Sequence, residues 1–283
     1  MDITSEMIKK LRDKTGAGMM DCKRALESTG GDMDAAIEHL RKKGAAIGQK
    51  RSDRATKEGV IVTRVSGNAK TGVVVEVNCE TDFVGRSEDF VRFGHAVAEA
   101  IEIHKPQSLD AVLGIATAAG KKISDLMNDV LAKVGEKIDL RRFQIIEAPN
   151  GIVSAYTHLG NRIGVLVELE GVAAGTPVAR DVAMQIAAMN PAVVTRDQVD
   201  KVWIERELDI YRTQAKNEGK PAQIQDKIAQ GRLEKFYQEV VLTEQTYIKD
   251  PGKTIRDVLR ESNPAQPGAV KRFTRFHLGE ETK

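Results

Sequence analysis

Cysteine is scarce in this sequence, with Cys22 and Cys79 as its two representatives in 283 residues. They lie far apart, and neither has a Cys or His partner at the spacing of a zinc site. This scarcity excludes a disulfide framework of the kind that stabilises small secreted domains. We therefore interpret both residues as reduced thiols of a cytoplasmic protein.

Long apolar runs and a strong excess of one charge are also lacking. No run approaches the ~20 residues that span a bilayer, and the start, Met1-Asp2-Ile3-Thr4, has neither the pattern of a secretion signal nor that of a transit peptide. The 43 Lys and Arg residues nearly balance the 41 Asp and Glu residues, for a net charge of +2. We expect a cytoplasmic protein without membrane contact and without direct nucleic-acid binding.

Motifs of enzymes are absent as well. Gly252-Lys253-Thr254 matches the end of a phosphate-binding loop, but Tyr247 occupies the place of its first glycine, so we interpret the match as chance. Gly16-Ala17-Gly18 lacks the third glycine of a dinucleotide fingerprint. The five His residues show no metal-ligand spacing. We expect no catalytic residue, no cofactor and no metal site.

The composition that remains, 41% hydrophobic and 30% charged, is that of an ordinary globular chain. Residues 1–45 predict a compact bundle of three helices joined by glycine turns. The first ends at Lys14, the third begins after the cap Asp32, and Gly44 is expected to end it. A basic segment follows at 46–57, with Lys50, Arg51, Arg54 and Lys57. It is interpreted as a solvated linker, with nucleic-acid contact as the alternative.

An internal repeat dominates the middle of the chain. A strand at Gly59–Val62, a Gly67-Asn68 turn and a second strand through Val77 return as a strand from Gly151, a Gly160-Asn161 turn and a strand through Leu169. Each copy predicts an antiparallel hairpin whose Gly-Asn pair supplies the positive φ. A helix is expected after each hairpin, over 87–104 and 176–189. The fold class is therefore α+β, with one subdomain at 58–148 and a related one at 149–283.

The second subdomain is interrupted by residues 195–239. Thr195 is expected to cap a helix that runs to Asn217, and a second helix returns after the turn at Gly219-Lys220-Pro221. The apolar stripe is thin and charges crowd both sides, which predicts a projecting antiparallel helical hairpin.

The stretch Val73–Val84, V-V-V-E-V-N-C-E-T-D-F-V, changes abruptly from a valine-rich strand to polar residues and a phenylalanine. Asp82 fits a helix cap and Phe83 a core residue, but the pair also fits a surface that contacts a partner. Met19-Met20 leaves the same two alternatives open. His158 fits a solvated loop, and Cys79 a buried structural thiol rather than a nucleophile paired with His95 or His158.

Two long motifs resemble those of the elongation factor Ts family. They are L-R-D-K-T-G-A-G-M-M-D-C-K-R-A-L at Leu11–Leu26 and E-V-N-C-E-T-D-F-V at Glu76–Val84. The resemblance continues in order through G-N-R-I-G-V-L-V at 160–167 and G-K-P-A-Q-I-Q-D-K-I-A-Q-G-R at 219–232, so it covers nearly the whole chain. It implies a ubiquitin-associated-like three-helix bundle, two repeated subdomains and an antiparallel coiled-coil hairpin.

The resemblance further implies a guanine-nucleotide exchange factor, not an enzyme of covalent chemistry, whose partner is the translational GTPase elongation factor Tu. In the family the T-D-F-V element approaches the magnesium and phosphate region of the GTPase and releases Mg²⁺ and then GDP. The residues here that match the family's contacts are Thr81, Asp82, Phe83 and Val84, then Arg12, Met19, Met20 and Lys23 of the bundle, and His158 of the second subdomain. The rival hypothesis is an adaptor protein without exchange activity.

Overall fold

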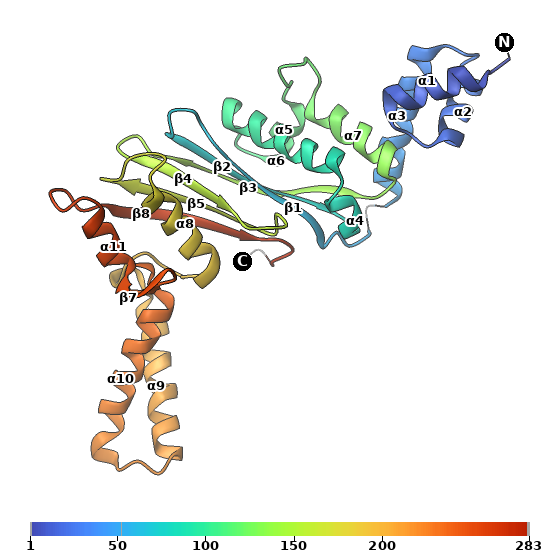
Figure 1. Ribbon diagram of the computed structural model, residues 1–283. Coiled ribbons are helices and arrows are strands. Elements are labelled where there is room, and N and C mark those ends of the chain that lie inside the picture. The colour runs from blue at the N-terminus through green and yellow to red at the C-terminus, as the bar shows by residue number, and fades with distance from the viewer. Residues whose placement is uncertain (1, 52, 282–283) are drawn as a thin grey trace.

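The computed structural model describes residues 2–51 and 53–281, with the side chains of residues 47–50 left aside, so the predicted contribution of Lys50 lies outside the described residues. Its fold is α+β: small antiparallel sheets with helices packed on them (Figure 1).

The helices are α1 Ser5–Thr15, α2 Met19–Ser28, α3 Met33–Lys50, α4 Asp82–Gly85, α5 Glu88–His104, α6 Leu109–Gly114, α7 Ile123–Val134, α8 Pro177–Met189, α9 Lys201–Asn217, α10 Ala222–Val240 and α11 Ile255–Ser262, with 3-10 turns η1 Arg196–Gln198 and η2 Leu242–Glu244. The strands are β1 Glu58–Val65, β2 Thr71–Cys79, β3 Ile138–Glu147, β4 Ile152–Thr157, β5 Ile163–Glu170, β6 Thr246–Tyr247, β7 Asp250–Thr254 and β8 Ala269–His277.

Helices α1, α2 and α3 form the predicted bundle. Thr4 caps α1, and Gly16, at φ 67°, ends it in the left-handed conformation that favours glycine. The carboxylate of Asp32 accepts the backbone N–H groups of Asp34 and Ala35, each at 2.9 Å, and so caps α3. The small core of the bundle includes Leu11 and Leu26. Its likeness to a ubiquitin-associated domain stays a prediction.

The prediction that Gly44 ends the third helix is wrong, because α3 continues to Lys50. The glycine serves a close contact between helices instead. A Cβ atom at residue 44 would overlap the carbonyl oxygen of Asn128 and lie 3.1 Å from the backbone nitrogen of Ala132, both on α7. Near this contact, Nε of Arg41 lies 2.9 Å from a carboxylate oxygen of Asp129. The bundle is therefore fixed to the rest of the molecule through α3 and α7.

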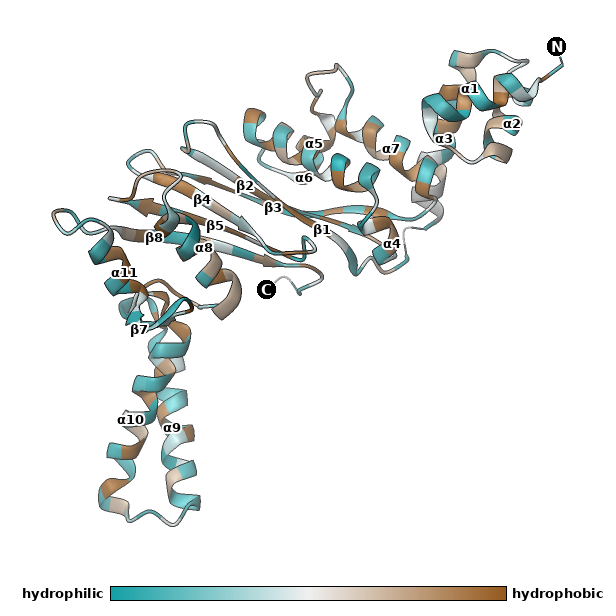
Figure 2. Ribbon diagram, viewed as in Figure 1, coloured by the Kyte–Doolittle hydropathy of each residue, from teal (hydrophilic) through white to brown (hydrophobic). Residues whose placement is uncertain are grey.

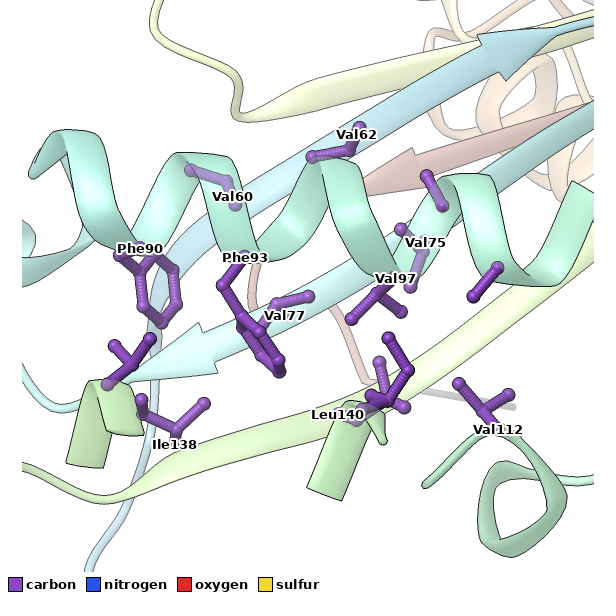
Figure 3. Packing of buried hydrophobic residues seen from close by; sticks show 14 of the residues in the cluster. Val60, Val62, Val75, Val77, Phe90, Phe93, Val97, Val112, Ile138 and Leu140 are labelled. Carbon is purple, nitrogen blue, oxygen red and sulfur yellow. The ribbon is translucent and has the colours of Figure 1, made fainter. Parts of the chain in front are cut away.

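The first sheet has the order β1-β2-β3, and α5 covers one of its faces. The predicted helical stripe is confirmed: Phe90, Phe93, Val97 and Ile101 of α5 are all buried. Figure 3 shows Phe90, Phe93 and Val97 of this stripe on the side of α5 that faces Val75 and Val77 of β2, with Ile138 and Leu140 of β3 beside them. Burial on this scale stabilises the sheet by roughly 1.5–3 kcal/mol for each large apolar side chain.

The second sheet, β4-β5-β8, repeats the first with α8 on its outer face. The repeat extends to a charged pair and a bulge. Glu76 of β2 lies opposite Arg142 of β3, and Glu168 of β5 lies opposite Arg272 of β8, with a register shift directly after each glutamate. Both pairs are 2.7 Å salt bridges. Glu76 is fully buried, so its arginine is needed to offset the loss of hydration.

The two sheets pack face to face between their helical layers (Figure 1). Figure 2 shows hydrophobic residues along the strands, whereas α9 and α10 are largely hydrophilic. The shared core is formed by alternate side chains of both sheets: Ile61, Val74, Ile146, Ala148, Val153, Leu166, Phe276 and Leu278. Because β2 and β5 are covered on both faces, they consist of nearly continuous apolar residues.

The two hairpin turns differ more than the repeat predicts. In the second, Gly160 at φ 84° and Asn161 at φ 54° have positive φ, as expected. In the first, the positive φ lies at Ala69 (56°), so the prediction for Gly67-Asn68 is wrong. The Asn68 side chain instead accepts the backbone N–H of Lys70 at 3.1 Å, which builds the turn by a side-chain hydrogen bond.

Helices α9 and α10 form the predicted projecting hairpin (Figure 1), although its coiled-coil character stays a prediction. Thr195 does not cap α9, as the sequence suggested. It caps the short turn η1 in a capping box with Gln198, and the side chain of Asp200 caps α9. Trp203 packs edge-on against Phe236, with 4.9 Å between ring centroids. The core near Trp203 thus joins the two helices at the base of the hairpin.

Candidate functional site

The candidate site centres on the wedge turn, Thr81–Val84, which follows β2 and opens the single-turn helix α4. Phe83 in this turn is 83% exposed, although the chain has seven phenylalanines and places Phe90 and Phe93 in its core. The interpretation of Phe83 as a core residue is therefore wrong. Val84 turns inward instead and packs on the core beneath α5. The turn consequently displays one large apolar side chain while its neighbour holds it to the fold.

The helix cap belongs to Thr81 and not to Asp82. The Thr81 hydroxyl oxygen accepts the backbone N–H of Val84 at 3.4 Å. Asp82 is the first residue of the helix, half-exposed, and forms a 3.0 Å salt bridge with Arg86 one turn later. Its carboxylate also interacts favourably with the helix N-terminus. Asp82 and Phe83 thus both face the surface.

Two glutamates that the sequence analysis did not single out hold the wedge turn from below. Both carboxylate oxygens of Glu136 accept hydrogen bonds from Thr81, one from its backbone N–H at 3.0 Å and one from its hydroxyl at 2.8 Å. Glu80 accepts the backbone N–H of Lys137 at 2.7 Å. The turn is therefore attached to the loop between α7 and β3.

The basic segment ends on this same cluster. Arg51 donates to both carboxylate oxygens of Glu80, at 2.8 and 2.9 Å, and Arg54 donates to one of them at 2.9 Å. The interpretation of a solvated segment does not hold for Arg51, which is bound to Glu80 and partly buried. The segment after α3 thus ends in ion pairs directly below the wedge turn.

Burial opposes the ionisation of Glu80. The Lys137 N–H and the two arginines outweigh this effect, however, and lower the pKa of Glu80 from 4.5 to about 2. Since the pKa in the folded state lies below that in the unfolded state, the unfolded chain binds more protons between these values. The ionised Glu80 therefore stabilises the folded protein fully above about pH 4.5, and this stabilisation is lost as the pH falls toward 2.

We expect Glu80→Gln to remove this part of the acid sensitivity, because a glutamine does not titrate. The wild type should exceed the variant by about 2–3 kcal/mol in free energy of unfolding at pH 7, and the difference should shrink steadily below about pH 4.5. Urea unfolding of both proteins at pH 7, 4 and 3 measures this. A difference that stays constant with pH would contradict the assignment.

Cys79 is a buried thiol, as favoured by the sequence. Its sulfur donates to the carbonyl oxygen of Thr81 at 3.1 Å. Burial, together with the nearby charge of Glu136, raises the pKa of Cys79 to about 12. A thiol that stays protonated at neutral pH is a poor nucleophile. Cys79 therefore contributes to the shape of the turn.

The turn between β4 and β5 lies beside the wedge turn, although some 75 residues separate the two in sequence. The backbone carbonyl of Asn161 accepts the N–H of Ile61 at 2.7 Å, and Arg162 forms a 2.6 Å salt bridge with Glu58. A groove of about 370 Å³ separates the two turns, and its walls include Asp82, Arg86 and Gly160–Arg162.

His158 and Leu159 are exposed in the β4–β5 turn. Nδ1 of His158 lies 3.1 Å from the hydroxyl of Tyr156, which restrains the ring. Leu159 is 90% exposed and was missed by the sequence analysis. An apolar residue next to a turn glycine was the available signal. The surface near the wedge turn thus includes a second exposed apolar side chain.

The bundle carries the remaining sequence-predicted residues. Met19 and Met20, at the start of α2, are 56% and 61% exposed, so the interpretation as core residues is wrong. Arg12 and Lys23 are exposed as well. The bundle lies at the same end of the molecule as α4 (Figure 1). The exposed methionines form a flexible apolar surface of the kind that adapts to a partner.

Other sites are weak candidates. Gly252-Lys253-Thr254 belongs to β7 and to the cap of α11, where Thr254 and Asp257 form a capping box, so the helix N-terminus is already occupied by a carboxylate. Among residues 2–51 and 53–281, no group of three or more His, Cys, Asp or Glu side chains is arranged to hold a metal ion. The wedge turn and its surroundings therefore remain the best candidate site.

Comparison with known proteins decides the family. The family model described as Elongation factor TS matches residues 80–280, more than half of the chain. The chain belongs to the elongation factor Ts family. Relatives named Elongation factor Ts include that of Chlorobium phaeobacteroides (strain BS1), 44% identical over 284 residues, which cover 98% of this chain and 99% of the relative.

Further relatives named Elongation factor Ts support the same family assignment. The protein of Prosthecochloris aestuarii is 45% identical with the same coverage, and that of Clostridium perfringens is 42% identical over 98% of this chain and 93% of its own length. The chain is accordingly a translation elongation factor. In the part of the chain that the structure describes, none of the helices has both the length and the apolar character of a membrane span.

Proposed function

We propose that this chain is a cytoplasmic guanine-nucleotide exchange factor that binds elongation factor Tu with bound GDP, disturbs its Mg²⁺ and phosphate site and releases GDP. The observation that supports this most directly is Phe83, an aromatic side chain 83% exposed on a turn otherwise held by hydrogen bonds. So large an apolar surface gains almost no stability from folding in the isolated protein, because it is exposed in the folded and the unfolded chain alike. The arrangement is explained if a partner covers it.

Exchange requires no covalent chemistry, which agrees with the absence of enzyme motifs from the sequence. GDP and Mg²⁺ hold the GTPase in one state, and a protein that binds the nucleotide-free state more tightly shifts the population toward it. Burying Phe83 in the partner would contribute roughly 1.5–3 kcal/mol toward this shift. Asp82, one residue before, would place a carboxylate near the phosphates and their metal, where it repels the phosphates and competes with them for Mg²⁺.

The other exposed residues fit the same partner. Met19, Met20, Arg12 and Lys23 of the bundle would contact its nucleotide-binding domain, and His158 would contact a more distant domain. Several separate contacts are needed, because one wedge supplies less free energy than tight nucleotide binding does. The groove between the wedge turn and the β4–β5 turn would lie inside this interface.

The test is the release of a fluorescent GDP analogue from elongation factor Tu in the presence of excess unlabelled GDP. We expect the release rate to rise with the concentration of this protein and to saturate. Prior removal of Mg²⁺ by a chelator should reduce the acceleration, because the step that the wedge assists has already occurred. By linkage, GDP should weaken binding of this protein to elongation factor Tu by the factor by which this protein weakens GDP.

The alternative is an adaptor that binds a partner without promoting exchange. Such a protein would bind with an affinity indifferent to GDP and to loss of the wedge turn. Unchanged GDP release at saturating concentrations of this protein would overturn the exchange function for this partner and favour the adaptor.

A further inference from the structure

Two carboxylates from distant parts of the chain accept backbone hydrogen bonds in a reciprocal pattern next to the wedge turn. Glu136 accepts the backbone N–H of Thr81, the residue after Glu80, and Glu80 accepts the backbone N–H of Lys137, the residue after Glu136. We call this reciprocal set of Glu80, Thr81, Glu136 and Lys137 the carboxylate clamp. It joins segments that lie 55 residues apart.

The wedge turn needs such support because its own helix is short. Helix α4 has four residues, and a single turn of helix is unstable by itself. Its cap bond, from the Val84 N–H to the Thr81 hydroxyl oxygen, is long at 3.4 Å. The exposed Phe83 gains little packing in this chain. Inward contacts come from Val84 and from Gly85, which lies against the backbone of Gly59.

Hydrogen bonds to an ionised carboxylate are stronger and more directional than neutral ones. Both groups that donate to Glu136 belong to Thr81, so one carboxylate fixes the backbone and the side chain of the capping residue together. Arg51 and Arg54 form ion pairs with Glu80 and compensate its charge. The clamp therefore fixes the direction in which the wedge turn leaves the end of β2.

We propose that Glu136, together with Glu80, is a positioning residue for nucleotide exchange: the clamp fixes the wedge turn so that Phe83 projects toward the partner in advance of binding. This inference rests on the proposed exchange function. The clamp acts through Phe83, because a preorganised side chain reaches its site on the partner without a further ordering cost.

Exchange kinetics of Glu136→Ala, Glu136→Gln, Phe83→Ala and the double variant Phe83→Ala/Glu136→Ala test this role. Glu136→Ala should lower the saturating rate of GDP release by about tenfold, with little change in the half-saturating concentration. The saturating rate of Glu136→Gln should lie between those of Glu136→Ala and the wild type. A glutamine keeps one acceptor oxygen for Thr81, whereas the glutamate offers two. In the Phe83→Ala background, Glu136→Ala should add no further loss.

The matched control is Glu99→Ala, which removes another ion-paired glutamate, 3.0 Å from Arg64, on α5. It should leave exchange unchanged. Independent losses from Phe83→Ala and Glu136→Ala that multiply in the double variant would overturn the proposal. So would a raised half-saturating concentration with an unchanged saturating rate, because that result would make Glu136 a partner contact.

Amide hydrogen exchange of this protein alone separates the clamp from the proposed function. Faster exchange at Thr81 and Val84 in Glu136→Ala and Glu136→Gln, with unchanged protection in β1 and β2, would support the clamp even if the wild type released no GDP. In that case the exchange function fails and the positioning of the turn stands as a structural property. Unchanged protection at Thr81 and Val84 would overturn the clamp itself.

Discussion

Replacing Phe83 with alanine should lower the saturating rate of GDP release from elongation factor Tu by about 30- to 100-fold, equivalent to roughly 2–3 kcal/mol. The physical reason is the loss of an apolar side chain that is exposed here and that the partner is proposed to bury. The free energy of unfolding should change by less than about 0.5 kcal/mol, since the side chain packs on little within this chain. Fluorescent GDP release and urea unfolding measure the two quantities.

Phe93→Ala is the matched control for this substitution. Phe93 lies ten residues further on and is 4% exposed, in contact with the core under α5. Its truncation should cost about 3–5 kcal/mol of stability. If Phe83→Ala destabilised the protein to a similar degree, Phe83 would be a packing residue. If exchange stayed fast in a stable Phe83→Ala variant, the wedge would lie elsewhere on the surface.

Replacing Gly44 with alanine should displace the bundle from the rest of the molecule. The new methyl group would overlap the Asn128 carbonyl oxygen and lie 3.2 Å from the Cβ atom of Ala132. Backbone atoms of a packed helix cannot move aside as a flexible side chain does, so α3 has to separate from α7. We expect a loss of about 1–3 kcal/mol in stability and a rise of about tenfold in the half-saturating concentration for exchange, because the bundle and the wedge turn would no longer match one partner surface.

Gly231→Ala provides the control with the opposite sign. Gly231 also lies inside a helix, α10, but a Cβ atom there meets nothing within 4 Å. Alanine at this position should stabilise the protein by about 0.5–1 kcal/mol and leave exchange unchanged. Urea unfolding followed by circular dichroism, together with GDP release at several protein concentrations, measures both variants. Equal effects of the two substitutions would show that Gly44 has no special role in packing.

Much of the fold follows from local sequence pattern. The spacing of Phe90, Phe93, Val97 and Ile101 predicted a buried helical stripe, and the structure confirms it. Hairpins, the bundle and the projecting helices were also predicted. The errors at Gly44, Gly67-Asn68 and Thr195 share one cause: a glycine, an asparagine or a cap former has several local uses, and the surrounding fold selects among them.

The sequence by itself determined the family, through motifs at Leu11–Leu26 and Glu76–Val84, and the order of the main helices and hairpins, because periodicity, caps and turns are short-range properties of the chain. The tertiary structure decided that Phe83 faces solvent while Val84 faces the core, and that Glu136 meets Thr81. No local pattern encodes such contacts. They depend on which distant segments the packing of α7 and the two sheets brings to the end of β2.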